Sequence, residues 1–166
     1  AAVYSFAEKH NLRFSYQTGF RSPDTQSQFI FFPTGTSTLL GTAKANAERY
    51  GVMEGGAWTN ESYQAFLLSG GTLDPATGDP IGGNSALLEE AYVDYIKPEK
   101  LSSIEIGYKG IIGDVLLVDM NYYNTNYTDF EGGQNVNAKF ASTHKGQAIP
   151  AGYTWALNSN TDADVR

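Results

Sequence analysis

The sequence contains no cysteine, and this absence excludes disulfide bonds, cysteine-ligated zinc and thiol catalysis. Only two histidines occur, His10 and His144, and neither stands in a metal-ligand spacing such as HExxH. Basic residues are few: eleven lysines and arginines stand against eighteen acidic residues, the net charge is −7, and no basic cluster is visible. Because affinity for nucleic acid comes largely from lysine and arginine neutralising phosphates, we expect no nucleic-acid partner.

Long hydrophobic runs are also missing. No stretch of about 18 apolar residues occurs, so we expect no transmembrane helix. Barrel strands, however, need only about 9–11 residues of alternating character to cross a bilayer. The 13% aromatics and 18 glycines suit such strands better than a packed α/β core. The first residues resemble mid-chain material rather than a signal peptide, which suggests a segment of a larger protein.

Motifs for catalysis and metal binding are weak throughout. There is no Gly-x-Ser-x-Gly elbow, no phosphate-binding glycine loop, and Glu89 and Glu90 are adjacent on an expected helix and point apart. His144 stands in a flexible Thr-His-Lys context. The run 74–80, "DPATGDP", superficially resembles a calcium loop but lacks the alternating acids and distal glutamate; Asp162 and Asp164 are expected in a solvated tip. We therefore predict no enzyme, no cofactor and no metal site.

Period-two alternation is the main structural signal. Residues 3–21 are predicted to form one strand, which ends where Pro23 stops the pairing. Its clearest part puts alternate residues on one face: Leu12, Phe14, Tyr16, Thr18 and Phe20. Residues 99–130 are predicted to form a hairpin that turns at Gly113–Asp114. One hairpin face is apolar, with Ile104, Ile106, Tyr108, Leu116, Val118, Met120 and Tyr122, and the other carries Glu105, Lys109, Asp119 and Asn121.

Two long connections separate these strands. Residues 22–98 are predicted to hold short helices rather than strands, within 39–51, 59–71 and 84–96, with Gly51 as one C-cap and Thr59 or Asn60 as an N-cap. Residues 131–166 show no clear periodic element. One short turn and two long connections at the opposite end are typical of outer-membrane barrels. A soluble β-rich domain with a long insertion has the same pattern, so both remain open.

Several segments of the sequence carry more specific information than the alternation of polar and apolar residues. Three motifs stand in order along the chain: "GFRSP" at 19–23, "IKPE" at 96–99 and "EIGYK" at 105–109. Together with "LLVDMNYYNTNYTDFEGG", they resemble the C-terminal barrel half of TonB-dependent outer-membrane receptors. The motifs cover about 50 of 166 residues in the right order. "KPEKLSSIEIGYKG" and "YTDFEGGQNV" resemble Bacteroidetes receptors with a carboxypeptidase-regulatory-like N-terminal domain.

The resemblance implies an all-β fold: an antiparallel transmembrane segment of a barrel of about 22 strands, with long extracellular loops containing short helices. The extracellular loops would be 22–98 and 131–166, and the plug domain and TonB box are not in this sequence. The implied partners are the rest of the barrel and plug, TonB through the missing N-terminal part, and the lipid bilayer. For a receptor of the starch-utilisation type, a surface lipoprotein lid is added.

The implied function is active import of a scarce or bulky nutrient across the bacterial outer membrane. The nutrient could be an oligosaccharide, a peptide, an iron chelate or a cobalamin, and this segment would supply wall and outer loops. A soluble, secreted carbohydrate-binding β domain is the alternative. Loop aromatics among glycine and amide residues are candidate ligand contacts: Trp58, Tyr92, Tyr153 and Trp155. The competing interpretation is that these aromatics form a small core that orders the loops.

Overall fold

The computed structural model describes residues 1–161. Asp162 and Asp164, which the sequence suggests are solvated, lie outside the described residues. The chain divides into two compact units. We call residues 1–22 and 98–130 the sheet unit, and residues 23–97 and 131–161 the loop unit.

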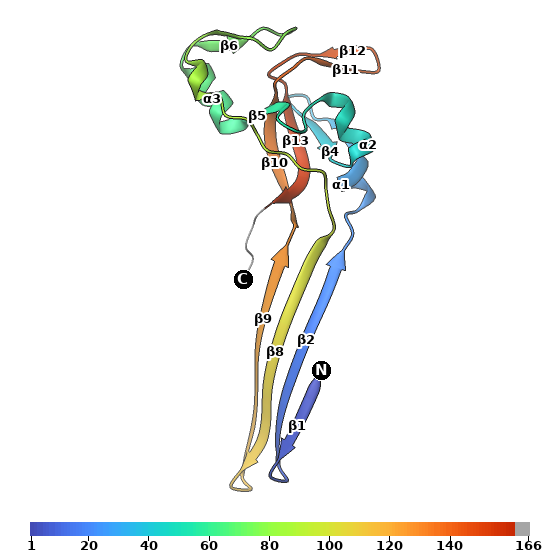
Figure 1. Cartoon of the computed structure of the whole chain (residues 1–166), viewed down its shortest axis with the longest axis vertical. Helices are drawn as coiled ribbons and strands as arrows, with labels where there is room; N and C mark the ends of the chain where they lie inside the picture. Colours follow the sequence, from blue (N-terminus) through green and yellow to red (C-terminus); the bar gives the residue numbers. More distant parts are fainter. Residues whose placement is uncertain (162–166) are drawn as a thin grey trace. The chain divides into compact units, whose positions relative to one another are not determined.

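The sheet unit is a four-stranded antiparallel sheet (Figure 1). Its strands are β1 (Ala2–Phe6), β2 (His10–Arg21), β8 (Glu99–Ile112) and β9 (Leu116–Thr128), in the order β1-β2-β8-β9. The predicted single strand over 3–21 is wrong, because residues 7–9 form a tight turn between β1 and β2. Ala7 has a φ of 43°, and its carbonyl accepts a hydrogen bond from His10 N–H at 2.9 Å. The polar Glu8 and Lys9 break the alternation there.

The second hairpin of this unit turns where the sequence places it. Gly113 and Asp114 have φ values of 59° and 61°, the left-handed conformation that hairpin turns require. Glycine reaches this region without steric cost, and aspartate tolerates it better than most residues. The turn joins Ile112 to Leu116, which are partners in the β8–β9 register.

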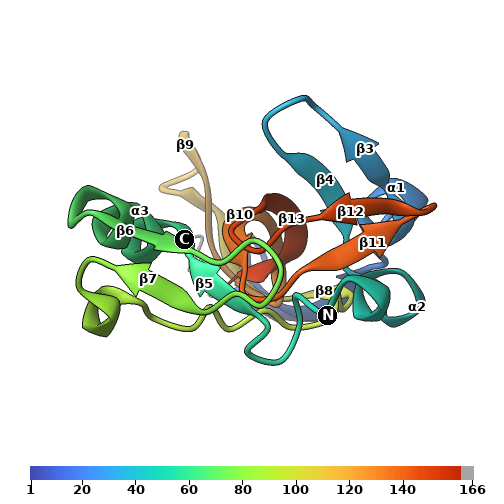
Figure 2. The same cartoon turned by 90° about the horizontal axis from the view of Figure 1, so that it is seen from above.

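The loop unit contains more strand than expected. Its elements are α1 (Thr25–Phe29), β3 (Phe31–Pro33), β4 (Thr38–Gly41), α2 (Lys44–Ala47), η1 (Glu48–Tyr50), β5 (Ala57–Thr59), α3 (Asn60–Leu68), β6 (Gly71–Leu73), β7 (Pro80–Gly82), η2 (Ser85–Leu87), β10 (Phe130–Ala138, beginning at the unit boundary), β11 (Ser142–His144), β12 (Gln147–Ile149) and β13 (Thr154–Thr161). A five-stranded sheet has the order β3-β4-β13-β10-β5, with β13 parallel to β4. Two hairpins, β6–β7 and β11–β12, complete the unit (Figure 2). No helix among the described residues is long and apolar enough to span a membrane.

The predicted loop helices are only partly correct. α3 forms as expected, with the Thr59 side chain accepting a hydrogen bond from Ser62 N–H at its start. Residues 39–51 are divided between β4, α2 and η1, although Gly51 caps the last turn in the left-handed conformation. The helix predicted over 84–96 is wrong: only the η2 turn forms, and residues 91–98 have no regular structure. The lack of a periodic element predicted for residues 131–166 is also wrong, since 131–161 include β10 to β13.

A buried core lies in the loop unit and centres on aromatic rings. Trp155 is fully buried, and the Tyr50, Tyr153 and Phe31 ring centroids lie 5.0, 5.4 and 6.2 Å from its own. The other buried core residues are aliphatic or small: Leu40, Ala47, Val52, Met53, Ala57, Ala91, Val93, Val136, Ala138, Ile149 and Leu157. These residues come from strands and connections that are far apart in sequence, so burial of this core orders both long connections.

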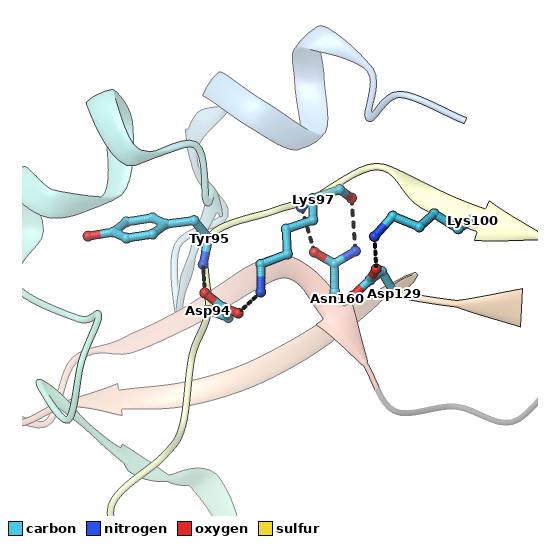
Figure 3. A network of polar contacts seen from close by, with 6 residues as sticks. All are labelled: Asp94, Tyr95, Lys97, Lys100, Asp129 and Asn160. Carbon is cyan, nitrogen blue, oxygen red and sulfur yellow. Dashed lines mark hydrogen bonds and ion pairs between the residues drawn. The ribbon is translucent and has the colours of Figure 1, made fainter. Parts of the chain in front are cut away.

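A side-chain clasp holds the irregular segment before β8 (Figure 3). The Asn160 side chain accepts a hydrogen bond from Lys97 N–H at 2.6 Å and donates one to the Lys97 carbonyl at 3.0 Å. The amide thus replaces the backbone pairing that a strand would supply. Lys97 also forms an ion pair with Asp94. The Lys100–Asp129 ion pair in the same figure belongs to the sheet unit, with a distance of 3.2 Å.

Candidate functional site

The register of the sheet unit separates two faces of opposite character. Leu12, Tyr108 and Met120 form one row across three strands, and Phe14, Ile106 and Tyr122 form the next. We call this side the apolar face; its strand residues are Ala2, Tyr4, Phe6, His10, Leu12, Phe14, Tyr16, Thr18, Phe20, Lys100, Ser102, Ile104, Ile106, Tyr108, Gly110, Ile112, Leu116, Val118, Met120, Tyr122, Asn124, Asn126 and Thr128. Most of its large side chains are exposed, and the four described strands place no aspartate or glutamate on it.

The opposite, polar face carries the charged residues of the strands. Arg13 donates to the Asn121 side chain at 2.8 Å and forms an ion pair with Asp119 at 3.4 Å. Lys109 reaches the same carboxylate at 3.6 Å, while Glu105 lies further along β8. The predicted division of the hairpin is therefore confirmed: its hydrophobic row and its charged row lie on opposite faces. Exposed ion pairs contribute little stability, so this network is consistent with a wet surface.

Ion pairs also connect elements at both ends of the sheet unit. At the short turns, Lys9 pairs with Asp114, and Ile111 N–H donates to the Lys9 carbonyl at 3.2 Å. At the other end, Arg21 Nε lies 2.8 Å from a Glu99 carboxylate oxygen, and the two residues are register partners. Arg21 is the last residue of β2 and belongs to the "GFRSP" motif, and Glu99 is the last residue of the "IKPE" motif. Both motifs can be recognised in the sequence, but the pairing of Arg21 with Glu99 cannot, because only the strand register brings the two residues together.

The four predicted ligand residues occupy different environments in the loop unit. Trp155 is 0% exposed, so its ring offers no surface to a ligand in this structure. Tyr153 is half-buried, and its hydroxyl lies 2.9 Å from the Thr38 hydroxyl. Trp58 is half-buried beneath the Lys139 ammonium, which lies 4.5 Å from the ring centroid, whereas Tyr92 is 83% exposed. Tyr153 and Trp155 are in contact, and a ligand-binding role for the four remains a prediction.

His144 has a role that the sequence did not reveal. The expectation of a flexible context is wrong: His144 ends β11, and its ring stacks on Phe31 with centroids 3.6 Å apart. The Tyr50 hydroxyl lies 2.8 Å from His144 Nδ1. Burial raises the pKa of Tyr50, so this phenol remains a neutral hydrogen-bonding group at ordinary pH. The trio attaches the β11–β12 hairpin to the core.

An open groove of about 430 Å³ lies beside the same hairpin. It is lined by Pro75, Ala76, Ala141, Ser142, Thr143, Ala148, Ile149 and Pro150. Its volume is within the range of small-molecule sites, and its walls are mostly apolar. The 74–80 run forms the turn beside it, where Thr77 and Ala76 N–H groups donate to the Asp74 carboxylate and lower its pKa. Backbone groups thus already engage the oxygen that a calcium loop would need.

A comparison of the chain with models of known protein families identified a β-barrel family, which is consistent with a sheet that has one apolar and one polar face. A family model described as "TonB dependent receptor-like, beta-barrel" matches residues 1–164. No curated protein and no solved structure matches the chain.

Proposed function

The chain belongs to the TonB-dependent receptor β-barrel family, and on that premise we propose that it forms part of the wall and outer loops of an active importer. Members of this family are transporters of the bacterial outer membrane rather than enzymes. The sheet unit is the proposed wall, with its apolar face toward lipid and its polar face toward the lumen. The loop unit is the proposed extracellular part, which meets the nutrient.

The observation that carries the proposal is the exposed apolar face. Alternate residues of four strands present hydrocarbon to the outside while every strand carboxylate lies on the other face. In water such a continuous apolar surface is unfavourable, whereas in a bilayer it is solvated by acyl chains. An open sheet edge in lipid would leave backbone groups unpaired, so we propose that further strands of the same receptor continue the sheet on both sides.

The dimensions of the apolar face are consistent with a membrane crossing. On β9 its hydrophobic residues run from Leu116 to Tyr122 and are followed by Asn124. The eight residue steps from Leu116 to Asn124, at about 3.4 Å each and tilted by about 40°, rise roughly 20 Å, close to the apolar band of about 25 Å in barrel proteins. Aromatic residues such as Tyr16 and Tyr122 lie near the upper limit of this band, as girdle residues do.

The finer features of the proposal follow the resemblance of the motifs. We place the receptor among the Bacteroidetes type with a carboxypeptidase-regulatory-like N-terminal domain. Its partners are the remaining barrel and plug, TonB, the lipid bilayer and, in a starch-utilisation type, a surface lipoprotein lid. The nutrient is an oligosaccharide, peptide, iron chelate or cobalamin, captured by the outer loops and moved with energy from the inner-membrane proton gradient.

Energy-dependent uptake by cells that carry the receptor tests this function. Cells with and without the receptor gene are given radiolabelled oligosaccharide, peptide, iron chelate and cobalamin in turn. We expect one class to accumulate only when the gene is present, and a protonophore to abolish this accumulation. Equal uptake of every class by both strains, or protonophore-resistant uptake, argues against active import.

The alternative, a soluble secreted carbohydrate-binding β domain, makes a different physical prediction. Such a domain must cover Ile104, Ile106, Leu116 and Val118 or remain soluble despite them. Size-exclusion chromatography and circular dichroism of the 166-residue chain, with and without detergent, separate the two. The importer proposal expects aggregation without detergent; a cooperatively melting monomer in plain buffer contradicts it.

Nutrient contact by the loop aromatics is part of the proposal and is tested separately. We expect Tyr92→Ala and Trp58→Ala to weaken binding of the transported nutrient, because these rings reach the surface. We expect Trp155→Ala to act through loss of the core, since that ring is buried. Leu68→Ala is a matched control, because Leu68 is an exposed residue of helix α3 in the loop unit. Isothermal titration measures binding, and equal affinities for Tyr92→Ala and Leu68→Ala would remove Tyr92 from the site.

A further inference from the structure

The ammonium group of Lys139, the residue that follows β10, contacts three groups that attract cations. It lies 4.5 Å from the Trp58 ring centroid and 5.8 Å from the Phe140 ring centroid, and it forms an ion pair with the Glu90 carboxylate. The face of an aromatic ring carries negative potential, so two rings and one carboxylate together favour an ammonium group. We call Trp58, Glu90 and Phe140 the cation cage.

The backbone that carries the cage is fixed without help from the lysine side chain. Trp58 is the register partner of Asn137 in β10, and it also forms an isolated bridge with Glu90. The Lys139 N–H donates to the Gly56 carbonyl at 2.9 Å. These contacts are made by main-chain groups, whereas the lysine ammonium stands at the end of a flexible four-carbon stem. The cage therefore stays assembled when that stem turns away.

Release of Lys139 from the cage costs little. Its side chain is 22% exposed, and those of its partners Glu90 and Phe140 are more exposed still. Ion pairs and cation–π contacts at exposed positions each contribute little stability. The released side chain also regains rotamer freedom. An ammonium group from another molecule can therefore replace the resident one.

The charge of the cage favours a cation over an anion. An anion that paired with Lys139 would have to displace Glu90 and approach the negative faces of two rings. A cation meets the same partners that already hold the lysine. Acidic residues also outnumber basic ones in the chain, eighteen to eleven, which favours the approach of cations. Of the four nutrient classes, peptides regularly carry ammonium groups, at the N-terminus and on lysine.

We propose that the cation cage binds an ammonium group of a peptide ligand, and that Lys139 occupies the cage until the ligand arrives. The ligand ammonium replaces the lysine against Trp58 and Glu90, and Lys139 turns into solvent. This inference rests on the proposed function, because it takes the loop unit as the part that meets the nutrient. It narrows the nutrient to the peptide class and makes Lys139 a competitor of the ligand.

Binding of four probe peptides to the intact receptor tests this assignment. One pair is tetraalanine amide with a free N-terminus and its N-acetylated form. The other pair is acetyl-Ala-Lys-Ala-Ala amide and the same peptide with an acetylated lysine. Isothermal titration is expected to show about fivefold tighter binding of an ammonium-bearing probe than of its acetylated partner. A preference in the first pair assigns the N-terminus, and a preference in the second assigns the lysine side chain.

Variants of the cage separate a competitor from a structural lysine. Lys139→Met removes the resident ammonium and keeps an unbranched side chain, so the ammonium-bearing probe should bind about two- to fivefold more tightly. A lysine that only supports the loop would give weaker or unchanged binding. Trp58→Leu and Glu90→Gln should each weaken binding of that probe about fivefold. Lys145→Met, at the β11–β12 turn, is the matched control and should leave binding unchanged.

A second measurement does not depend on the stability of the Lys139→Met variant. The lysines of the receptor are labelled by reductive ¹³C-methylation, and the Trp58 ring shifts the Lys139 methyl signal upfield. The signal is identified by its absence in Lys139→Arg. Saturation with the ammonium-bearing probe should move it to the position of solvent-exposed lysines.

Three results overturn the proposal: equal binding of each probe and its acetylated partner, equal effects of Lys139→Met and Lys145→Met, or a Lys139 signal that the probe does not move. A receptor that actively imports another nutrient but ignores these peptides refutes this inference alone. A receptor that imports no nutrient actively refutes the proposed function as well.

Discussion

Met120→Lys is the sharpest test of which face meets lipid. Met120 is 60% exposed on the apolar face, beside Tyr108 in the register. It lies four residues from Leu116 and four from Asn124, which places it about 10 Å from each limit of the apolar band at about 3.4 Å per residue and a tilt of about 40°. A lysine at this depth is near the midplane, where it costs about 2–4 kcal/mol in a barrel protein.

Leu117→Lys is the matched control for this change. Leu117 is on the same strand and 61% exposed, but it lies on the polar face with Asp119. Lysine there faces water and a carboxylate, so we expect a change within about 0.5 kcal/mol, as for an ordinary surface substitution. Guanidinium unfolding of the membrane-embedded receptor, followed by tryptophan fluorescence, measures both free energies. Equal costs for the two variants, or a larger cost for Leu117→Lys, would refute the assignment of faces.

Two further predictions concern the loop unit. Gly71→Ala should lower the free energy of unfolding by about 1–3 kcal/mol, because its methyl group would lie 2.2 Å from the buried Phe66 ring. Gly133→Ala, with nothing within 4 Å, is the control, and equal thermal shifts for the two would contradict the packing argument. The Lys97 hydrogen bond holds the pKa of Asp94 below its ordinary 3.8, so its stabilisation is complete above that pH and is lost as the pH falls below it. Asp94→Asn should therefore remove part of the acid-induced loss of thermal stability, and a wild-type pH profile in that variant would contradict this.

Helix α3 of the loop unit and the neighbouring segment 84–96 show how much of the fold local sequence signals determine. Thr59 and the Gly70–Gly71 pair predicted α3, and it spans Asn60–Leu68 with Thr59 as its cap. The segment 84–96 had equally good helix formers but forms only a 3₁₀ turn. Tertiary contacts decide the difference: Ala91 and Val93 are buried in the core, and Ala91 N–H bonds to the Ala57 carbonyl. Helix propensity is too weak to resist such contacts.

The candidate ligand residues also show that local sequence does not determine which side chains are buried. Trp58 and Trp155 stand in similar glycine- and threonine-containing contexts, yet one is half-buried at β5 and the other is fully buried. Trp155 is buried because β13 pairs in parallel with β4, where Trp155 faces Thr38 across more than a hundred residues of sequence. No local pattern contains that pairing. An exposed residue such as Tyr92 could be distinguished from it only in the folded chain.

The sequence by itself determined the two faces of β2, β8 and β9 and the turn between the last two. It could do so because side chains alternate strictly along a strand, and Gly113–Asp114 readily adopts positive φ. Tertiary structure alone decided that residues 3–21 turn back on themselves, that residues 131–161 include strands, and that Arg21 meets Glu99. Those outcomes depend on pairing between distant segments, whose hydrogen bonds and burial leave no periodic signal in either segment.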